Sequence, residues 1–266
     1  MSPSAFKRCV WRYYQVHGRH DLPWRSTHDP YAIWVSELML QQTQVSRVIP
    51  KFLAFLERFP TIETLAKASL QEVLQYWQGL GYNRRAKYLH QAAQVVSSQG
   101  MFPENSTAWR ALPGIGEYTA NAIMAFAYNQ PVVIIETNVR TVFLHHFFPN
   151  RDQVTDAEIK VLIEQMVPKR RSRDWYYALM DYGVYLKGKY GNANIRSKHY
   201  TKQTKFLGSN RQIRGRLIKA LLTAKKTESA LVLELDAEQK RLQEQLAILI
   251  QEGLVKQEGR YFMLPT

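Results

Sequence analysis

Cysteine is almost absent from this chain: Cys9 is the only one in 266 residues. No internal disulfide can form, and no metal site of four thiolates can be built from the chain. Long apolar runs are also missing, and residues 1–15 lack the apolar core of a signal peptide. We therefore expect a protein of the reducing cytoplasm that is not associated with a membrane.

Acidic residues are scarce as well. The 36 Lys and Arg against 22 Asp and Glu give a formal net charge of +14, which favours a polyanionic partner such as nucleic acid. Between Lys187 and Lys226 there are twelve Lys or Arg and no acid. This basic segment fits either a surface that follows phosphates or a disordered basic connector, and the sequence does not decide between them.

Sequences typical of β-strands are rare in the first 200 residues, where only the run VVII at 132–135 is β-like. Helical signals occur throughout. Asp29 before Pro30 is typical of a helix start, and the apolar spacing that follows predicts two helices with a break near Gln41. The main body is predicted to be all-α.

Two helix starts have the spacing of a capping box, in which the side chains of the first and fourth residues each bond the other's backbone. They are Ser69 with Glu72 and Thr155 with Glu158. Gly79, Gly81 and Gly100 are expected to end helices.

The C-terminal residues 206–266 have the pattern of a small separate module. The segments RQIRGRLIKALLTAKK, TESALVLELD and AEQKRLQEQLAILIQEG predict three helices, and LVKQEGRYFMLP predicts a small β-wing. This order is typical of a winged helix. Such modules bind DNA in some proteins and other proteins in others, so the fold alone leaves the partner open.

The segment LPGIGEYTANAIMAF at 112–126 predicts a helix-hairpin-helix. Pro113 ends one helix, Gly114 and Gly116 permit a tight turn, and the apolar spacing from Ala120 indicates a second helix. Backbone N–H groups at the start of that helix can contact a DNA phosphate without reading a base.

Five separated motifs occur together: LPWR, SELMLQQTQV, GLGYNRRAKYLHQAA, LPGIGEYTANAI and ETNVR. In this order they resemble the helix-hairpin-helix DNA glycosylases, most closely the MutY adenine glycosylases, over roughly residues 20–186. The resemblance implies a two-lobed all-α glycosylase domain over 1–205 that flips the target base into the cleft between its lobes. The six-helix module would span about 29–134, and the second lobe would combine 1–28 with 135–205.

The resemblance also implies roles for four residues in breaking an N-glycosidic bond, which needs an acid for the departing base and an anion for the cationic sugar. Glu37 matches the general acid, although a surface glutamate would look the same. Glu136 stands where the family carries an aspartate, and Asn138 matches the asparagine that holds it or is a helix cap. Tyr118 occupies the position of the lysine in bifunctional lyases, so we expect no efficient lyase chemistry; core packing is the alternative.

Further residues are expected to contact DNA. Gln41, Gln42 and Tyr82 match residues that wedge into the duplex around the extruded base, although Gln42 and Tyr82 could instead cap or pack helices. The arginines expected at phosphates are Arg25, Arg84 and Arg85. The remaining DNA-binding candidates are Leu112, Gly114, Ile115, Gly116 and Arg140.

Two departures from the family limit the comparison. Leu186 lies near the position of the first cysteine of an iron–sulfur loop, so we expect no cluster and no other cofactor. The winged-helix-like module replaces the domain that recognises 8-oxoguanine in the adenine enzymes. We therefore expect a monomeric, nucleoid-associated glycosylase for a mispaired base in double-stranded DNA, with adenine as the first candidate. A glycosylase for thymine, uracil or a deaminated or alkylated purine, or a catalytically weak DNA-binding protein, remains open.

Overall fold

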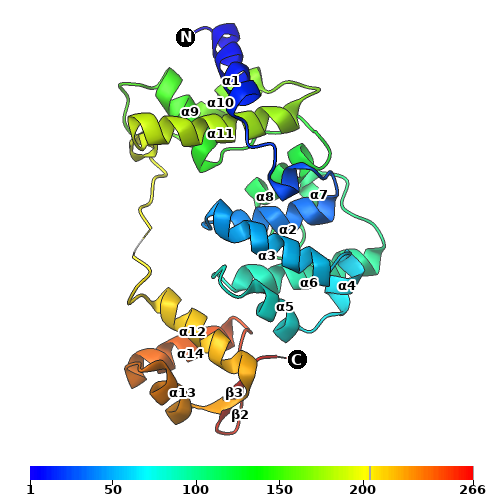
Figure 1. Ribbon diagram of the computed structural model, residues 1–266, viewed down its shortest axis with the longest axis vertical. Coiled ribbons are helices and arrows are strands. Elements are labelled where there is room, and N and C mark those ends of the chain that lie inside the picture. Colours follow the sequence, from blue (N-terminus) through cyan, green and yellow to red (C-terminus); the bar gives the residue numbers. More distant parts are fainter. Residues whose placement is uncertain (204, 266) are drawn as a thin grey trace. The chain divides into compact units, whose positions relative to one another are not determined.

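The computed structural model describes residues 1–203 and 205–265, which fold into two compact units. The first unit comprises residues 1–37, 104–111 and 115–202, and the second comprises residues 38–103, 112–114 and 203–266. Helix α2 (Pro30–Leu40) runs from the first unit into the second. The described part of the chain is mainly helical, as the sequence predicts (Figure 1).

The first unit contains helices and no strand among its described residues. Its core is an aromatic cluster in which the ring of the fully buried Phe6 lies 5.4 Å from Phe143 and 6.0 Å from Trp175. Burial of one such side chain contributes about 1.5–3 kcal/mol. Besides the start of α2, the unit contains α1 (Pro3–His17), η1 (Pro23–Arg25), α7 (Ser106–Arg110), α8 (Glu117–Phe126), α9 (Thr137–Phe147), α10 (Asp156–Met166), α11 (Ser172–Tyr190) and η2 (Ala193–Arg196).

The second unit packs four helices of the predicted six-helix module with the C-terminal residues. Phe55 on α3 packs against Phe59, 4.9 Å between ring centroids, and against Trp77, 6.0 Å. The four helices are α3 (Val45–Arg58), α4 (Ile62–Lys67), α5 (Leu70–Trp77) and α6 (Arg84–Gln99). Gly100 ends α6 in a left-handed conformation with φ 71°, as expected of a helix-ending glycine.

The C-terminal residues form three helices and a three-stranded antiparallel sheet with strand order β1-β3-β2. In this sheet Lys226 pairs with Phe262, and Gln257 pairs with the same residue from the other side. The elements are α12 (Asn210–Thr223), β1 (Lys226–Thr227), α13 (Glu228–Leu235), α14 (Gln239–Gln251), β2 (Lys256–Glu258) and β3 (Tyr261–Met263).

The helix starts follow the predicted caps, with one difference. Asp29 accepts the N–H groups of Tyr31 and Ala32, and both halves of the Thr155–Glu158 capping box form. The box predicted at Ser69 is only half formed. The Ser69 hydroxyl accepts the Glu72 N–H at 3.1 Å, but the Glu72 carboxylate pairs with Arg58, because an opposite charge is within its reach.

The β-like run at 132–135 forms no strand, which agrees with the predicted all-α main body. The segment forms no ladder with a described strand. Its backbone groups bond to side chains: the Tyr176 hydroxyl donates to the Val132 carbonyl at 2.6 Å and accepts the Ile134 N–H at 3.1 Å. The Asn121 amide donates to the Val133 carbonyl at 2.9 Å. These bonds satisfy backbone groups around the buried Ile134 without a partner strand.

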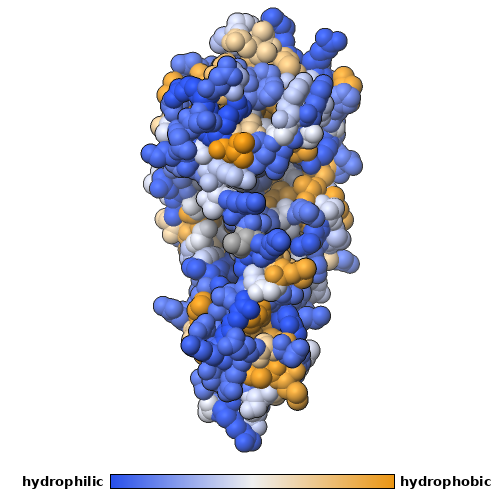
Figure 2. All heavy atoms as spheres, turned by 90° about the vertical axis from the view of Figure 1, so that its left-hand side faces the viewer, coloured by the Kyte–Doolittle hydropathy of each residue, from blue (hydrophilic) through white to orange (hydrophobic). Residues whose placement is uncertain are grey.

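The surface shows small separate groups of apolar side chains on a mainly hydrophilic face (Figure 2). Such scattered exposure is ordinary for a folded domain. Among the residues that the structure describes, no helix combines the length and apolar character needed to cross a bilayer.

The start of the basic segment is folded against α9. The Asn194 amide, 2% exposed, donates to Thr141 Oγ1 at 2.6 Å and to the Thr137 carbonyl at 3.1 Å. Arg196 donates to the Leu144 carbonyl at 3.1 Å, and Ser197 forms a bridge with Val154. A disordered connector therefore does not describe residues 192–198.

We expect Asn194→Ala to lower the free energy of unfolding by about 1–3 kcal/mol, because it removes two buried hydrogen bonds that Asn194 donates to α9. Urea denaturation followed by circular dichroism measures the change. Ile195→Ala is the matched control, because Ile195 is 65% exposed and its truncation should cost much less. Equal stability of the Asn194→Ala and wild-type proteins would contradict the structural role.

Candidate active site

Glu37 is a buried acid in the middle of an apolar helix. Its side chain lies in α2, where the neighbouring Val35, Leu38 and Met39 are all buried, and the residue is only 6% exposed. The Tyr118 hydroxyl, on α8, donates to Glu37 Oε2 at 3.0 Å. The glutamate is therefore not a solvated surface residue.

Burial raises the pKa of Glu37 from 4.5 to about 7, because an apolar surrounding disfavours the charged form. The hydrogen bond from Tyr118 opposes this rise, and the charge of Glu136 adds to it. Burial also raises the pKa of Tyr118 well above 10, followed by the charges of Glu37 and Glu136. Near neutral pH the site thus combines a carboxyl group that can hold a proton with a permanently protonated phenol.

Glu136 is the N-cap residue of α9, and Asn138 binds both of its carboxylate oxygens. The backbone N–H of Asn138 donates to Oε2 at 2.7 Å, and its side-chain amide donates to Oε1 at 3.0 Å. Burial raises the pKa of Glu136, while these hydrogen bonds oppose the rise. The positive end of the helix dipole further favours a carboxylate at this position.

Gly183 on α11 keeps Asn138 in place. A Cβ atom at Gly183 would lie 2.3 Å from the Asn138 carbonyl oxygen and 2.8 Å from the Asn138 Cβ, closer than atoms can approach. Helices α9 and α11 therefore pack at a distance that only glycine permits. This packing fixes the helix end on which Glu136 and Asn138 lie.

Arg25 does not lie on the surface as a phosphate contact would, so this prediction is wrong. Its guanidinium group binds Asp181 with two hydrogen bonds of 2.7 and 2.9 Å, and only 5% of its side chain is exposed. Arg19 also binds this carboxylate, at 2.7 Å. Burial works to raise the pKa of Asp181, but the bonds to Arg25 and Arg19 hold it below its ordinary value. The group is an internal charge cluster between η1 and α11.

Arg140 is likewise engaged inside the first unit. It binds Asp156, at the start of α10, with two bonds of 2.8 Å, and 16% of its side chain is exposed. Such a bidentate pair uses the donors that a phosphate would need. The structure therefore assigns Arg140 to the connection of α9 with α10, in place of the expected DNA contact.

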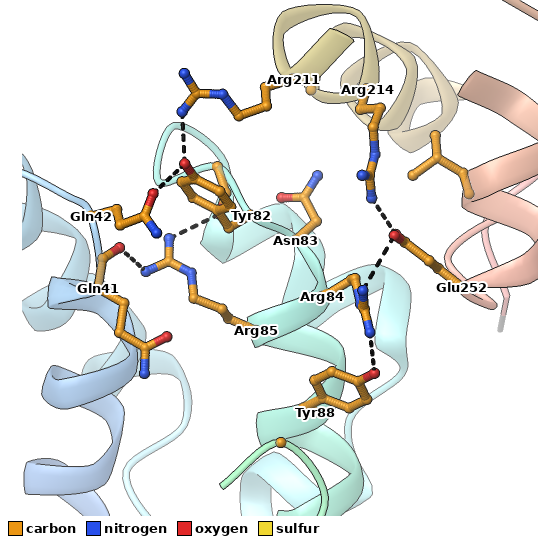
Figure 3. Close-up of a pocket in the computed structure, with 14 residues that line it drawn as sticks. Gln41, Gln42, Tyr82, Asn83, Arg84, Arg85, Tyr88, Arg211, Arg214 and Glu252 are labelled. Carbon is orange, nitrogen blue, oxygen red and sulfur yellow. Dashed lines mark hydrogen bonds and ion pairs between the residues drawn. The ribbon is translucent and has the colours of Figure 1, made fainter. Parts of the chain in front are cut away.

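Gln41, Gln42 and Tyr82 come together in the second unit, on two loops (Figure 3). The Tyr82 hydroxyl donates to Gln42 Oε1 at 2.5 Å. Gln42 and Tyr82 both have left-handed backbones, with φ of 54° and 49°. Such conformations are uncommon for residues other than glycine and concentrate at functional sites.

Arg85 holds these two loops together and is not a surface phosphate contact, contrary to the prediction. One of its terminal nitrogens donates to the carbonyls of Leu38 at 2.5 Å and Gln41 at 2.6 Å. The other donates to the carbonyls of Leu80 at 3.1 Å and Gly81 at 3.0 Å. The residue is 9% exposed, and burial lowers its pKa to about 10.

Arg84 has an exposed side chain and remains a candidate phosphate contact. It donates to the Tyr88 hydroxyl at 2.7 Å and lies 3.7 Å from the Glu252 carboxylate, which also binds Arg214 (Figure 3). Surface pairs of this kind contribute little energy and can be exchanged for a phosphate.

The helix-hairpin-helix has the predicted elements, α7 and α8 joined by 111–116. Gly114 has φ 73°, and a Cβ there would lie 2.4 Å from Tyr88 Cβ, so only glycine fits. Gly116 is the N-cap of α8. The side chains of Leu112 and Ile115 are buried, so only their backbone groups are available for a DNA contact.

Tyr177 was not identified from the sequence. It is 5% exposed, its ring stacks on Phe126 at 4.7 Å, and its hydroxyl has no hydrogen-bond partner among the described residues. Burial raises the pKa of its hydroxyl, and the charge of Glu37 adds to the rise. A tyrosine in an aromatic-rich helix gives no sequence signal of this kind.

The residues do not fit an iron–sulfur cluster, which is held by cysteine thiolates. Cys9, the only cysteine, lies in α1 with its Sγ 3.3 Å from the Tyr182 hydroxyl. Leu186 is buried in α11, and no group of three His, Cys, Asp or Glu suited to a metal occurs among the described residues.

Residues 35–169 match the profile described as HhH-GPD superfamily base excision DNA repair protein. The chain belongs to this superfamily. The matched range contains Glu37, Tyr118 and Glu136, and it also contains the hairpin.

Curated relatives of this HhH-GPD chain are adenine DNA glycosylases. That of Buchnera aphidicola subsp. Baizongia pistaciae is 35% identical over 69% of this chain and 53% of its own length. That of Homo sapiens is 36% identical over 68% of this chain and 36% of its own. The chain spans about half the length of the first of these. The adenine DNA glycosylase of Mycolicibacterium smegmatis is 34% identical over 92% of both chains.

Two solved structures share the fold of this superfamily member. A thermostable thymine-DNA glycosylase has a TM-score of 0.61 and 28% identity, covering 68% of this chain and 86% of its own. An endonuclease III in a non-covalent DNA complex has a TM-score of 0.57 and 17% identity, covering 71% and 87%. The second similarity establishes the fold alone.

The raised pKa of Glu37 predicts how stability depends on pH. Between pH 4.5 and about 7 the unfolded chain loses this proton while the folded chain keeps it, so stability falls as the pH rises through this range. Glu37→Gln carries no such charge. Above pH 7 we expect this variant to unfold with a free energy higher than that of the wild type by on the order of 3 kcal/mol.

Urea denaturation at about pH 5 and about pH 9 measures this difference, which should be small at the lower pH. Glu57→Gln is the matched control, because Glu57 is exposed on α3 and its change should not depend on pH in this way. A difference between wild type and Glu37→Gln that is the same at both pH values would show that Glu37 ionises normally.

Proposed function

We propose that this protein is a monofunctional DNA glycosylase that removes mispaired adenine from double-stranded DNA. The observation that carries the proposal is the buried Glu37 carboxyl group, with a pKa of about 7 and a hydrogen bond from Tyr118. A proton donor with this pKa is half-charged near neutral pH, where a general acid is most effective. The membership of the HhH-GPD superfamily supports this reading.

The reaction follows from the two acids. Protonated Glu37 gives its proton to a ring nitrogen of the flipped base, and the glycosidic C–N bond breaks as its electrons move to the base. The sugar then carries the positive charge of an oxocarbenium ion, which the Glu136 carboxylate stabilises. Water adds to the sugar carbon and loses a proton, and Glu37 is reprotonated from solvent. Asn138 keeps the Glu136 oxygens in position.

Adenine is the proposed base because the curated relatives are adenine DNA glycosylases, among them one that matches 92% of this chain. Thymine is the second candidate, favoured by the similarity to a thymine-DNA glycosylase structure. A panel of duplexes with adenine, thymine or uracil opposite each normal base and 8-oxoguanine separates the two by which base is released.

The proposed chemistry stops at base release, without strand cleavage. A lyase step needs an amine that forms a Schiff base with the sugar. Tyr118 offers only a hydroxyl group, which is already bonded to Glu37 and whose pKa is raised well above 10.

The residues proposed to contact DNA are Gln41, Gln42, Tyr82, Arg84 and the backbone of residues 112–116. An inserted side chain partly replaces the stacking lost when a base is flipped, which costs a few kcal/mol. The left-handed backbones of Gln42 and Tyr82 support a wedge function, because strain of this kind is held in place only by surrounding contacts. We further propose that the protein acts as a monomer on the nucleoid.

The C-terminal residues 206–266 are proposed to be a winged-helix module. Their order of helix, strand, two helices and two strands, with a three-stranded antiparallel sheet, supports this. The match to the Mycolicibacterium smegmatis enzyme covers 92% of this chain, which is more than residues 1–205 contain. The similarity to that enzyme therefore extends into the module.

The proposed role of Glu37 is tested by Glu37→Gln, which should reduce base excision by at least about 1000-fold while duplex affinity stays within a few-fold, because the acid acts in the transition state. Single-turnover excision from an adenine-containing duplex measures the rate. In the wild type the rate should fall as the pH rises through about 7, when Glu37 loses its proton. Undiminished excision by the variant would remove Glu37 from the mechanism.

A separate test concerns Glu136, which stands where related enzymes carry aspartate. Both oxygens of this longer side chain are held by Asn138, so we expect it to be correctly placed. Glu136→Asp should then lower excision by about 10- to 100-fold, because it moves the anion by about 1 Å. Glu136→Gln should lower it further, because it removes the charge. Faster excision by Glu136→Asp would show that the native glutamate is misplaced.

A further inference from the structure

Two glycines inside helices, Gly188 and Gly215, have no atom within 4 Å of an added Cβ, and of these two only Gly215 lines the cavities described below. Gly215 lies inside α12, where glycine costs helix stability relative to alanine. An added Cβ there would have no atom within 4 Å, so no close packing requires glycine. Gly183, by contrast, is held by its contact with Asn138. A ligand that approaches the helix closely would account for Gly215.

Gly215 lines two cavities that meet at Tyr82. One, of about 420 Å³, contains the pair of Arg214 with Glu252 (Figure 3). The other, of about 560 Å³, lies between α12 and the loops around Gln42 and Gly79. We call this second cavity the α12 groove. Its volume falls in the range that encloses a ligand of small-molecule size, about 300–1,000 Å³.

The α12 groove has the composition of a nucleic-acid site. Four cations line it, and no aspartate or glutamate is among its described lining residues; the four are Arg47, Arg211, Arg216 and Lys219. Amide groups of glutamine and asparagine line it as well. Two aromatic side chains belong to it, Tyr82 and Phe206, and they are 37% and 55% exposed. Cations bind phosphates, amides can bond base edges, and exposed rings accept the faces of unpaired bases.

Polar contacts connect the C-terminal part of the chain to this groove. Arg211 Nη1 donates to the Tyr82 hydroxyl at 2.7 Å, and Gln203 Nε2 donates to the same oxygen at 2.6 Å and to Gln42 Oε1 at 3.0 Å. These contacts bring α12 to the loops that Arg85 holds in place. The groove is thus built jointly by α12 and by the loops of Gln42 and Tyr82.

We propose that the α12 groove binds an unpaired strand of DNA, with phosphates on its cations and bases against Phe206 and Tyr82. A cavity of this size fits single nucleotides and not a double helix, and stacking on these rings needs base faces that a duplex keeps covered. The inference rests on the proposed glycosylase function in one respect: that function is the reason for naming DNA as the nucleic acid that binds. It assigns to α12 a strand-binding role in addition to base removal.

Gly215→Leu tests the groove, because the larger side chain fills it while improving the helix. We expect single-stranded DNA affinity to fall at least 10-fold and Tm to rise by about 2–4 °C. Gly188→Ala is the matched control: Gly188 is exposed in α11, also has no atom within 4 Å of an added Cβ, and does not line the groove. It should raise Tm without changing affinity.

Fluorescence anisotropy with a labelled oligothymidine and with a blunt duplex of equal length, on the full chain, gives both affinities. Phe206→Ala should weaken single-strand binding by about 5- to 150-fold, the loss expected for one stacked base. Lys219→Gln should reduce the slope of log affinity against log salt by about 0.7. Lys240→Gln, the same charge change on α14 outside the groove, should leave this slope within error of the wild type.

Single-strand affinity of Gly215→Leu within twofold of the wild type would overturn the inference. So would an equal loss of duplex and single-strand affinity, which would assign the groove to a duplex backbone. If Gly215→Leu does not fold, Gly215→Ala and Phe206→Ala give the same comparison. All binding is repeated in Glu37→Gln, which should bind like the wild type, so the outcome does not depend on whether the protein excises adenine.

Discussion

The burial of one carboxyl group, that of Glu37, is the constraint on which the candidate active site depends. An ionised Glu37 in an apolar helix costs free energy, and the chain reduces this cost by keeping the proton on and by providing one phenolic donor. Glu136 adds to the cost, because its charge reaches Glu37. The two acids are therefore not independent: ionising one makes ionisation of the other harder, and this separates a proton donor from an anion.

The fold and the acids could be predicted from the sequence because their signals are local. The Thr155 capping box, Gly100 and the hairpin glycines act within a few residues, and the motifs around Glu37 and Glu136 are contiguous. The β-like run at 132–135 forms no strand, and the reason for this is not local. The bonds that replace a ladder come from Tyr176, more than 40 residues along the chain.

Arg25, Arg85 and Arg140, which were expected to contact DNA, show the same limit of local sequence signals. Arg25 binds Asp181, which is 156 residues away in the sequence. Arg85 binds the carbonyls of Leu38 and Gln41, which are more than 40 residues away. A guanidinium group looks identical in sequence whether its donors face a phosphate or the protein's own backbone. Composition predicts that cations are numerous but not which of them are used internally. The Tyr177 hydroxyl, which has no hydrogen-bond partner in the described part of the chain, could not be foreseen either, because this property depends on the residues that surround it.

Arg85 couples the loop of Gln42 to the loop of Tyr82. One guanidinium group is bonded to both, so neither loop can change its backbone without breaking bonds that also restrain the other. The two loops therefore do not change conformation independently. A ligand that orders one loop thereby lowers the entropic cost of ordering the other, and the two side chains can respond to that ligand cooperatively although they lie 40 residues apart in the chain.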